Sequence, residues 1–257
     1  MKTRMDKSIC SWWDGPCLFE VLDRIEIPLR DPKGPVRMPI IDKYKDMGTV
    51  VMGKIEAGTI REGDSLLIMP NKSHVKVIGL NLDESKVRRA GPAENVRVKL
   101  SGVEEEDVMS GFVLSSVGKF LVTEFCVHLN SNPVGAVNEF IAQLQILELL
   151  DNAIFTAGYK AVLHIHSVVE ECEIVELIEE IDMKKKKGDP KKKKPKRKPL
   201  FVKNGAIVVC RIQVNNLICI EKFSDFPQLG RFTLRTEGKT VAVGKVVDVP
   251  PAGSPTF

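Results

Sequence analysis

The chain has 257 residues, 43% of them hydrophobic, which is enough for one large domain or two ordinary ones with real cores. No apolar run reaches about 18 residues, so no membrane-spanning helix is expected. The polar stretch from Met1 to Ile9 lacks the apolar segment of a secretory signal. The six cysteines are scattered without a CxxC pair. These features predict a cytoplasmic protein with reduced thiols and no membrane contact.

The net charge of +4 comes from one segment. Between Met183 and Leu200 there are 11 basic residues and one acid, Asp189, and without them the chain has 27 basic against 33 acidic residues, or −6. Most of the chain is therefore mildly acidic, and the basic character is local.

A short helix is expected at the start of the chain, within residues 1–27. Asp14 and Gly15 precede Pro16, a residue suited to the first turn of a helix, and Pro28 ends the pattern. Leu18, Leu22 and Ile25 would share one face. A helix of about a dozen residues is too short to be stable alone, so we expect it to pack on another element.

Short β-branched segments separated by turns follow, from residue 28 to residue 119. The clearest strand alternates strictly. Val96, Val98 and Leu100 face one way, and Asn95, Arg97 and Lys99 face the other. Many short strands at this spacing predict an all-β domain, an antiparallel barrel or sandwich.

A second all-β domain is expected over residues 134–249, followed by a disordered tail at 250–257. The segment Phe140–Leu150 fits helix or strand by its periodicity, and we assign it as a strand from its β-rich context. The Lys-rich residues 183–199 predict a solvated, disordered loop joining two strands. The same segment could contact ribosomal RNA or resemble a nuclear import signal. The candidate RNA-contacting residues are Lys184, Lys185, Lys191, Lys192, Lys196 and Arg197.

Several motifs suggest chemistry that their context does not support. Gly48–Ile55 matches a phosphate loop but ends in isoleucine, where a hydroxyl would be needed for Mg²⁺, and Gly238–Thr240 lacks the earlier glycine. His164 and His166 would share one face of a strand without a third metal ligand. The acidic cluster Glu104–Asp107 is typical of a solvated loop. We therefore predict no catalytic, cofactor-binding or metal-binding residues, and no enzyme activity.

The order of the segments resembles a known family. Trp12–Asp23 followed by Pro39–Val51 is similar to the elongation-factor-1-alpha-like GTPases, at the point where the GTP domain ends and barrel domain 2 begins. Further segments make the whole resemble the class II eukaryotic peptide chain release factors over about residues 10–248. They are Met69–Lys72, Gly158–His166, Phe226–Arg235 and Glu237–Thr240. The long Lys/Pro-rich insert resembles plant members.

This resemblance implies an all-β fold of two consecutive six-stranded antiparallel barrels, domains 2 and 3, preceded by the last helix of a GTP domain. It implies a monomer that binds the class I, stop-codon-reading release factor and the ribosome, with domain 2 facing the small subunit and its RNA. GTP and Mg²⁺ would belong to the intact family member, because the GTP-binding elements are absent here. The ribosome-rescue GTPase and elongation factor 1-alpha, which delivers aminoacyl-tRNA, are the alternatives.

The resemblance also implies which residues bind the partner. They are Gly230, Arg231, Phe232, Thr233, Leu234 and Arg235. If Phe232 and Leu234 point into the barrel, Arg231 and Arg235 would make the direct contacts, as arginine often does at interfaces. Two further features depart from the family. Residues 120–132 look like an insertion, which makes 120–133 an atypical linker, and the loss of the GTP domain would expose the apolar side chains of Trp12–Phe19.

Overall fold

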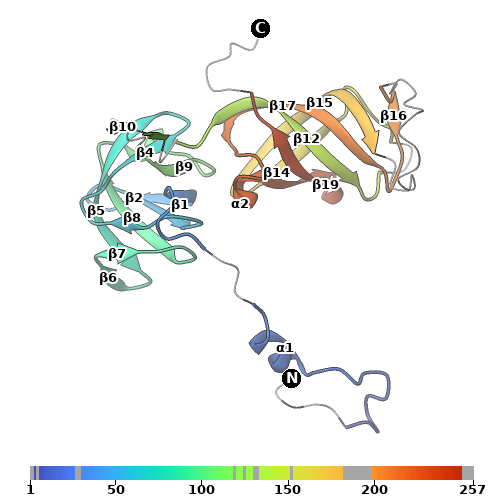
Figure 1. Cartoon of the computed structure of the whole chain (residues 1–257), viewed down its shortest axis with the longest axis horizontal. Coiled ribbons are helices and arrows are strands. Elements are labelled where there is room, and N and C mark those ends of the chain that lie inside the picture. The colour runs from blue at the N-terminus through green and yellow to red at the C-terminus, as the bar shows by residue number, and fades with distance from the viewer. Residues whose placement is uncertain are drawn as a thin grey trace. The chain divides into compact units, whose positions relative to one another are not determined.

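The computed structural model describes Thr3, residues 6–26, 30–117, 120–123, 126–129, 133–150, 153–181 and 198–250. The chain divides into two compact units, Met1–Arg30 and Asp31–Phe257. The second unit contains both barrels, and Figure 1 labels most of their strands. The six predicted RNA-contacting residues between Lys184 and Arg197 lie outside the described residues, as does the tail from residue 251.

The first unit contains one short helix, α1, at Leu18–Asp23. Glu20 stabilises its start, because its Oε2 accepts a hydrogen bond from the backbone N–H of Cys17 at 3.2 Å. The helix has 6 residues, so the predicted length of about a dozen is wrong. None of its residues is buried, and a helix without a packed face keeps little of its predicted length. Trp12, with 83% of its surface exposed, and Phe19, with 43%, are exposed as expected, whereas Leu22, at 50%, does not pack as its apolar face suggested.

The first barrel is a closed ring of six antiparallel strands in the order β4-β9-β1-β2-β8-β5, closed by the pairing of β4 with β5. Its strands are β1 (Arg37–Lys45), β2 (Thr49–Lys54), β4 (Ser65–Met69), β5 (Ser73–Leu82), β8 (Asn95–Ser101) and β9 (Val113–Ser116). Smaller elements complete it: β3 (Ile60–Arg61), β6 (Ser85–Val87), β7 (Arg89–Ala90) and the 3-10 turn η1 (Glu105–Asp107). Val96, Val98 and Leu100 are buried, which confirms the alternation predicted for β8.

The second barrel is also closed, in the order β12-β17-β15-β14-β18-β19. Its strands are β12 (Ala136–Ile146), β14 (Lys160–Ile165), β15 (Val168–Ile181), β17 (Ile207–Cys219), β18 (Arg231–Thr236) and β19 (Lys239–Asp248). The small strands β13 (Phe155–Thr156) and β16 (Phe201–Val202) pair with each other, and the short helix α2 (Pro227–Gly230) precedes β18. The two barrels confirm the predicted all-β fold.

The ambiguous segment that starts at Phe140 is a strand, as predicted. Phe140 and Ile146 belong to β12, and alternate residues between them lie in the core of the barrel. Pairing with β17 on one side and β19 on the other satisfies the backbone of β12. These long-range pairings select the strand, which the period of the sequence alone does not.

The segment predicted as an atypical linker contains regular structure. β10 (Phe120–Thr123) and β11 (Cys126–Leu129) come between β9 and β12 in the chain, and they form a two-stranded antiparallel sheet. The β-branched and aromatic residues of this segment favour such a pairing over an irregular connection.

Among the cysteines whose side chains the structure describes, three lie in the interior of the second unit. Burial raises the pKa of the Cys172, Cys210 and Cys219 thiols to about 12 in each case. They therefore stay protonated at neutral pH and act as small apolar side chains. Cys10 and Cys17 are partly exposed. Separately, no helix in the described ranges is long and apolar enough to cross a membrane.

Candidate partner-binding surface

The predicted partner-binding strand, β18, lies between β14 and β19. Phe232 and Leu234 point into the barrel and are 4% and 0% exposed. The Phe232 ring packs edge-to-face on Phe140, with their centroids 5.7 Å apart. Because side chains alternate along a strand, Arg231 and Arg235 point outward. The arginines therefore belong to the surface, and the apolar residues between them hold the strand in the core.

Gly230 differs from its predicted position. It is the last residue of α2 rather than the first of the strand, and it is buried. A Cβ atom at Gly230 would lie 2.6 Å from the backbone N and Cα atoms of Phe223, so only glycine allows this close approach. Gly230, Phe232 and Leu234, all predicted to bind the partner, are thus placed in the interior.

The outer side of β18 presents three polar side chains: Arg231, which is exposed, and Thr233 and Arg235, which are half-buried. The guanidinium of Arg235 donates a hydrogen bond from Nη2 to the carbonyl of Gly238, at 2.6 Å, across the turn between β18 and β19. This bond fixes the direction of the Arg235 side chain. Next to it lies a pocket of about 270 Å³ whose charged lining residues include Lys160, Glu173 and Glu237.

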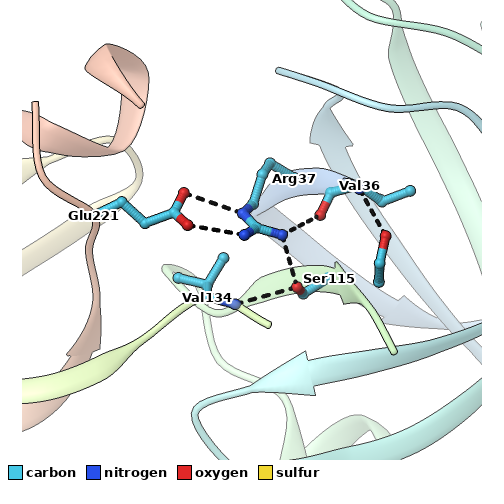
Figure 2. Close-up of polar contacts among 6 residues, drawn as sticks. Val36, Arg37, Ser115, Val134 and Glu221 are labelled. Atoms are coloured by element: carbon cyan, nitrogen blue, oxygen red, sulfur yellow. Dashed lines mark hydrogen bonds and ion pairs between the residues drawn. The ribbon is translucent and has the colours of Figure 1, made fainter. Parts of the chain in front are cut away.

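A buried ion pair joins the start of the first barrel to the second (Figure 2). The guanidinium of Arg37 on β1 donates two hydrogen bonds to the Glu221 carboxylate, from Nε at 3.1 Å and from Nη2 at 2.8 Å. The side chains of Arg37 and Glu221 are 4% and 20% exposed. Nη1 of Arg37 donates to the Val36 carbonyl and to Ser115 Oγ, and the latter also accepts the N–H of Val134. Most donors of the buried guanidinium are thereby satisfied.

An apolar cluster lies between the barrels as well. It contains Met69 and Val113 from the first barrel with Val134, Cys219 and Leu229, all of them buried. We refer to this cluster and the Arg37–Glu221 pair together as the barrel junction. Leu229 immediately precedes Gly230 and Arg231, so the junction and the start of β18 are held by the same short helix, α2. No pattern in the sequence predicts the junction, because Arg37 and Glu221 are 184 residues apart and belong to no motif.

The two histidines do not form a pair on one strand face, contrary to the prediction. His164 points outward from β14, while His166 lies in the following turn with φ at +39°. Nε2 of His166 donates to the Cys219 carbonyl at 2.9 Å, and burial lowers the pKa of its imidazole. Within the described ranges no group of three potential ligands is placed to hold a metal ion.

The motifs that resemble phosphate loops have other structures. Gly48–Ile55 contains strand β2, which lies between β1 and β8. Gly238–Thr240 begins in the tight turn before β19, where Glu237 and Gly238 have positive φ. Neither segment opens a helix, as a phosphate loop must.

Comparison with known domains defines the class of protein. A family model described as Elongation factor Tu domain 2 matches residues 48–115, and one described as GTP-eEF1A C-terminal domain-like matches residues 139–247. Both closed barrels are thus of the kind found in translational GTPases.

Relatives over the whole chain narrow this class. The chain is 41% identical to the eukaryotic peptide chain release factor GTP-binding subunit of Kluyveromyces lactis, over 97% of this chain and 33% of that protein. The protein of the same name from Candida albicans is 40% identical, over 96% of this chain and 32% of the relative. The chain therefore belongs to the family of eukaryotic peptide chain release factor GTP-binding subunits and spans about a third of their length.

Solved structures of related proteins agree with this family assignment. A crystal structure of sup35 complexed with GDP superposes with a TM-score of 0.73 and 37% identity, over 97% of this chain and 56% of that one. A second structure, of sup35 complexed with GMPPNP, gives 0.72. The relatives from Kluyveromyces lactis and Candida albicans are both yeast proteins, and they lend no support to the expected likeness to plant members.

Proposed function

We propose that the chain serves translation termination by docking the class I release factor on the outer side of β18. The observation that carries this proposal is the division of the strand into two sides. Phe232 and Leu234 anchor it in the core, and Arg231 and Arg235 are held outward. Arginines on a rigid strand lose little conformational freedom on binding, which favours them as interface anchors.

The barrel junction supports the same proposal. Leu229 is buried in the junction, and the chain then passes through Gly230 directly into Arg231. A partner bound to β18 would therefore be held in a defined relation to the first barrel. Two barrels joined in this way suit a protein that must present one partner to the ribosome.

Contact with the ribosome is the second part of the proposal. On the outer side of the first barrel, Lys76 of β5 and Arg97 of β8 are exposed, and Lys99 is half-buried. Cations of this kind suit the phosphates of ribosomal RNA. The Lys-rich segment, outside the described residues, stays a candidate for RNA contact. We place this function in the cytoplasm and propose that the chain is monomeric.

Charge reversal on β18 tests the docking. We expect Arg231→Glu and Arg235→Glu each to weaken binding of the purified chain to a class I release factor by about thirtyfold, in isothermal titration calorimetry. The control is Lys203→Glu, which reverses an exposed charge just after β16 in the same barrel. That variant should bind like the wild type. Wild-type affinity in both arginine variants, or no binding by the unmodified chain, would refute the proposal.

We further infer that this chain does not hydrolyse GTP, and that GTP and Mg²⁺ are bound elsewhere in the intact family member. The two candidate phosphate loops are a barrel strand and a β-turn, which supports this inference. Equilibrium dialysis of the purified chain with labelled GTP and Mg²⁺ should give no saturable binding. A saturable isotherm at micromolar GTP would show the inference to be wrong.

A further inference from the structure

One turn of the second barrel packs against the first barrel beside the barrel junction. It comprises His166, Ser167 and Val168 and leads from β14 into β15. Gly111, which precedes β9 of the first barrel, lies against it, since a Cβ atom at Gly111 would be 2.5 Å from Val168 Cγ2. A larger residue than glycine would therefore push this turn away from the first barrel. We call His166–Val168 the junction turn.

His166 connects the junction turn to Cys219, a residue of the barrel junction. Its Nε2 donates to the Cys219 carbonyl at 2.9 Å, and Cys219 has a hydrogen bond to the backbone of Val113 in the first barrel. A carbonyl oxygen only accepts, so Nε2 carries a proton. In the neutral ring Nδ1 is then left to accept from the Ser167 hydroxyl, 3.3 Å away. The neutral ring thus belongs to a set of hydrogen bonds that extends from the second barrel to the first.

The carboxylates nearest to this site in the chain already have other partners. Glu221, two residues after Cys219, accepts two hydrogen bonds from Arg37. Glu170, near the start of β15, accepts a hydrogen bond from the side-chain amide of Asn216 on β17. A second proton on the His166 ring would therefore gain little from either acid.

The other elements around the junction turn add no negative charge. Residues 109–113 of the first barrel are uncharged. On β18 the residue next to Phe232, the partner of Ile165, is Arg231, a cation that disfavours another positive charge nearby. Burial lowers the pKa of the His166 imidazole, and the hydrogen bond to the Cys219 carbonyl opposes this only in part. The site therefore favours the neutral ring.

We propose that the junction turn is an acid-sensitive latch, in which the neutral His166 ring keeps the barrel junction closed and protonation of the ring opens it. In the open junction the ring reaches water and titrates near the ordinary value of about 6.5. The closed junction binds the proton less readily. It is therefore most stable above about pH 6.5 and weakens as the pH falls below that value. This inference concerns the contact between the barrels and does not depend on the proposed docking of a partner.

Alkylation of Cys219 by iodoacetamide measures the opening, because this residue is 0% exposed in the closed junction. Cys210, in the core of the second barrel, is the internal control for unfolding of the barrel itself. Trypsin cuts after Arg211 and so places the two thiols in separate peptides for mass spectrometry. Each rate is divided by the rate of the same thiol in the urea-unfolded chain at the same pH, which removes the effect of pH on the thiol chemistry.

The normalised rate at Cys219 should rise severalfold in the wild type between about pH 7.5 and about pH 5.5. The upper limit is about tenfold, set by the titration of an ordinary imidazole. The rate at Cys210 should change by less than about twofold. His166→Gln keeps an Nε2 donor but has no titratable ring, so the rise should disappear. His164→Gln removes the outward-pointing histidine of β14 and should keep the rise.

Three results would overturn the latch. They are a Cys219 rate that does not change with pH in the wild type, an equal rise in His166→Gln, and a parallel rise at Cys210. Circular dichroism checks folding of each variant. If His166→Gln unfolds, His166→Asn replaces it, because asparagine tolerates the φ of +39° at this position. That variant also lacks a titratable ring, so it should show no rise, and a rise equal to that of the wild type would again refute the proposal.

Discussion

Replacement of Glu221 by alanine is expected to lower the free energy of unfolding by about 3 kcal/mol, because it leaves the buried guanidinium of Arg37 without its counter-charge. The Arg37 side chain is only 4% exposed and cannot turn to water without opening the barrel junction. Arg37 keeps its hydrogen bonds to Val36 and Ser115. The expected loss in the free energy of unfolding therefore lies at the lower end of the range for buried ion pairs that lose one partner. Urea denaturation followed by circular dichroism measures the effect.

Two companion variants show whether burial is the cause. Glu62→Ala removes a carboxylate of the exposed pair with Lys86, whose charged atoms are 3.5 Å apart, and should cost less than about 1 kcal/mol. The double variant Arg37→Met with Glu221→Leu removes both charges and should restore most of the stability, since nothing charged is then left buried. A loss in Glu221→Ala no larger than that in Glu62→Ala would contradict this account of the junction.

Phe232→Ala is expected to lower the free energy of unfolding by about 3 to 5 kcal/mol, although Phe232 lies in the segment predicted to bind the partner. The ring is 4% exposed and packs on Phe140. Gly244 of β19 lies directly beneath it, since a Cβ atom there would be 2.5 Å from Phe232 Cζ. Alanine would leave a cavity at this contact, and thermal unfolding followed by circular dichroism should detect a large fall in the midpoint.

The comparison with Arg231→Glu makes this prediction specific. Arg231 is exposed, so its reversal should change stability by less than about 0.5 kcal/mol while weakening partner binding. The two variants should thus separate stability from recognition within one hexapeptide. If Phe232→Ala were as stable as the wild type but bound the class I factor weakly, Phe232 would make direct contact and the division of β18 into two sides would be wrong.

Local patterns predicted the strands well where one side of the strand is buried. The alternation in Asn95–Ser101 and the apolar positions of Phe140–Ile146 both match the observed cores. Local patterns failed at the first helix and at the end of β14. The first helix is shorter than its apolar spacing suggests, because none of its residues is buried. His166 leaves the strand period because the turn into β15 directs its ring to the Cys219 carbonyl.

The amino-acid sequence by itself determined the fold class, the two barrels and the resemblance to release factors. Strand periodicity, turn residues and short motifs are local properties that can be read along the chain. Only the tertiary structure decided which residues meet across it. Arg37 and Glu221 pair over 184 residues, and His166 meets the Cys219 carbonyl over 53 residues. Such contacts depend on barrel closure and strand register, which no local pattern specifies.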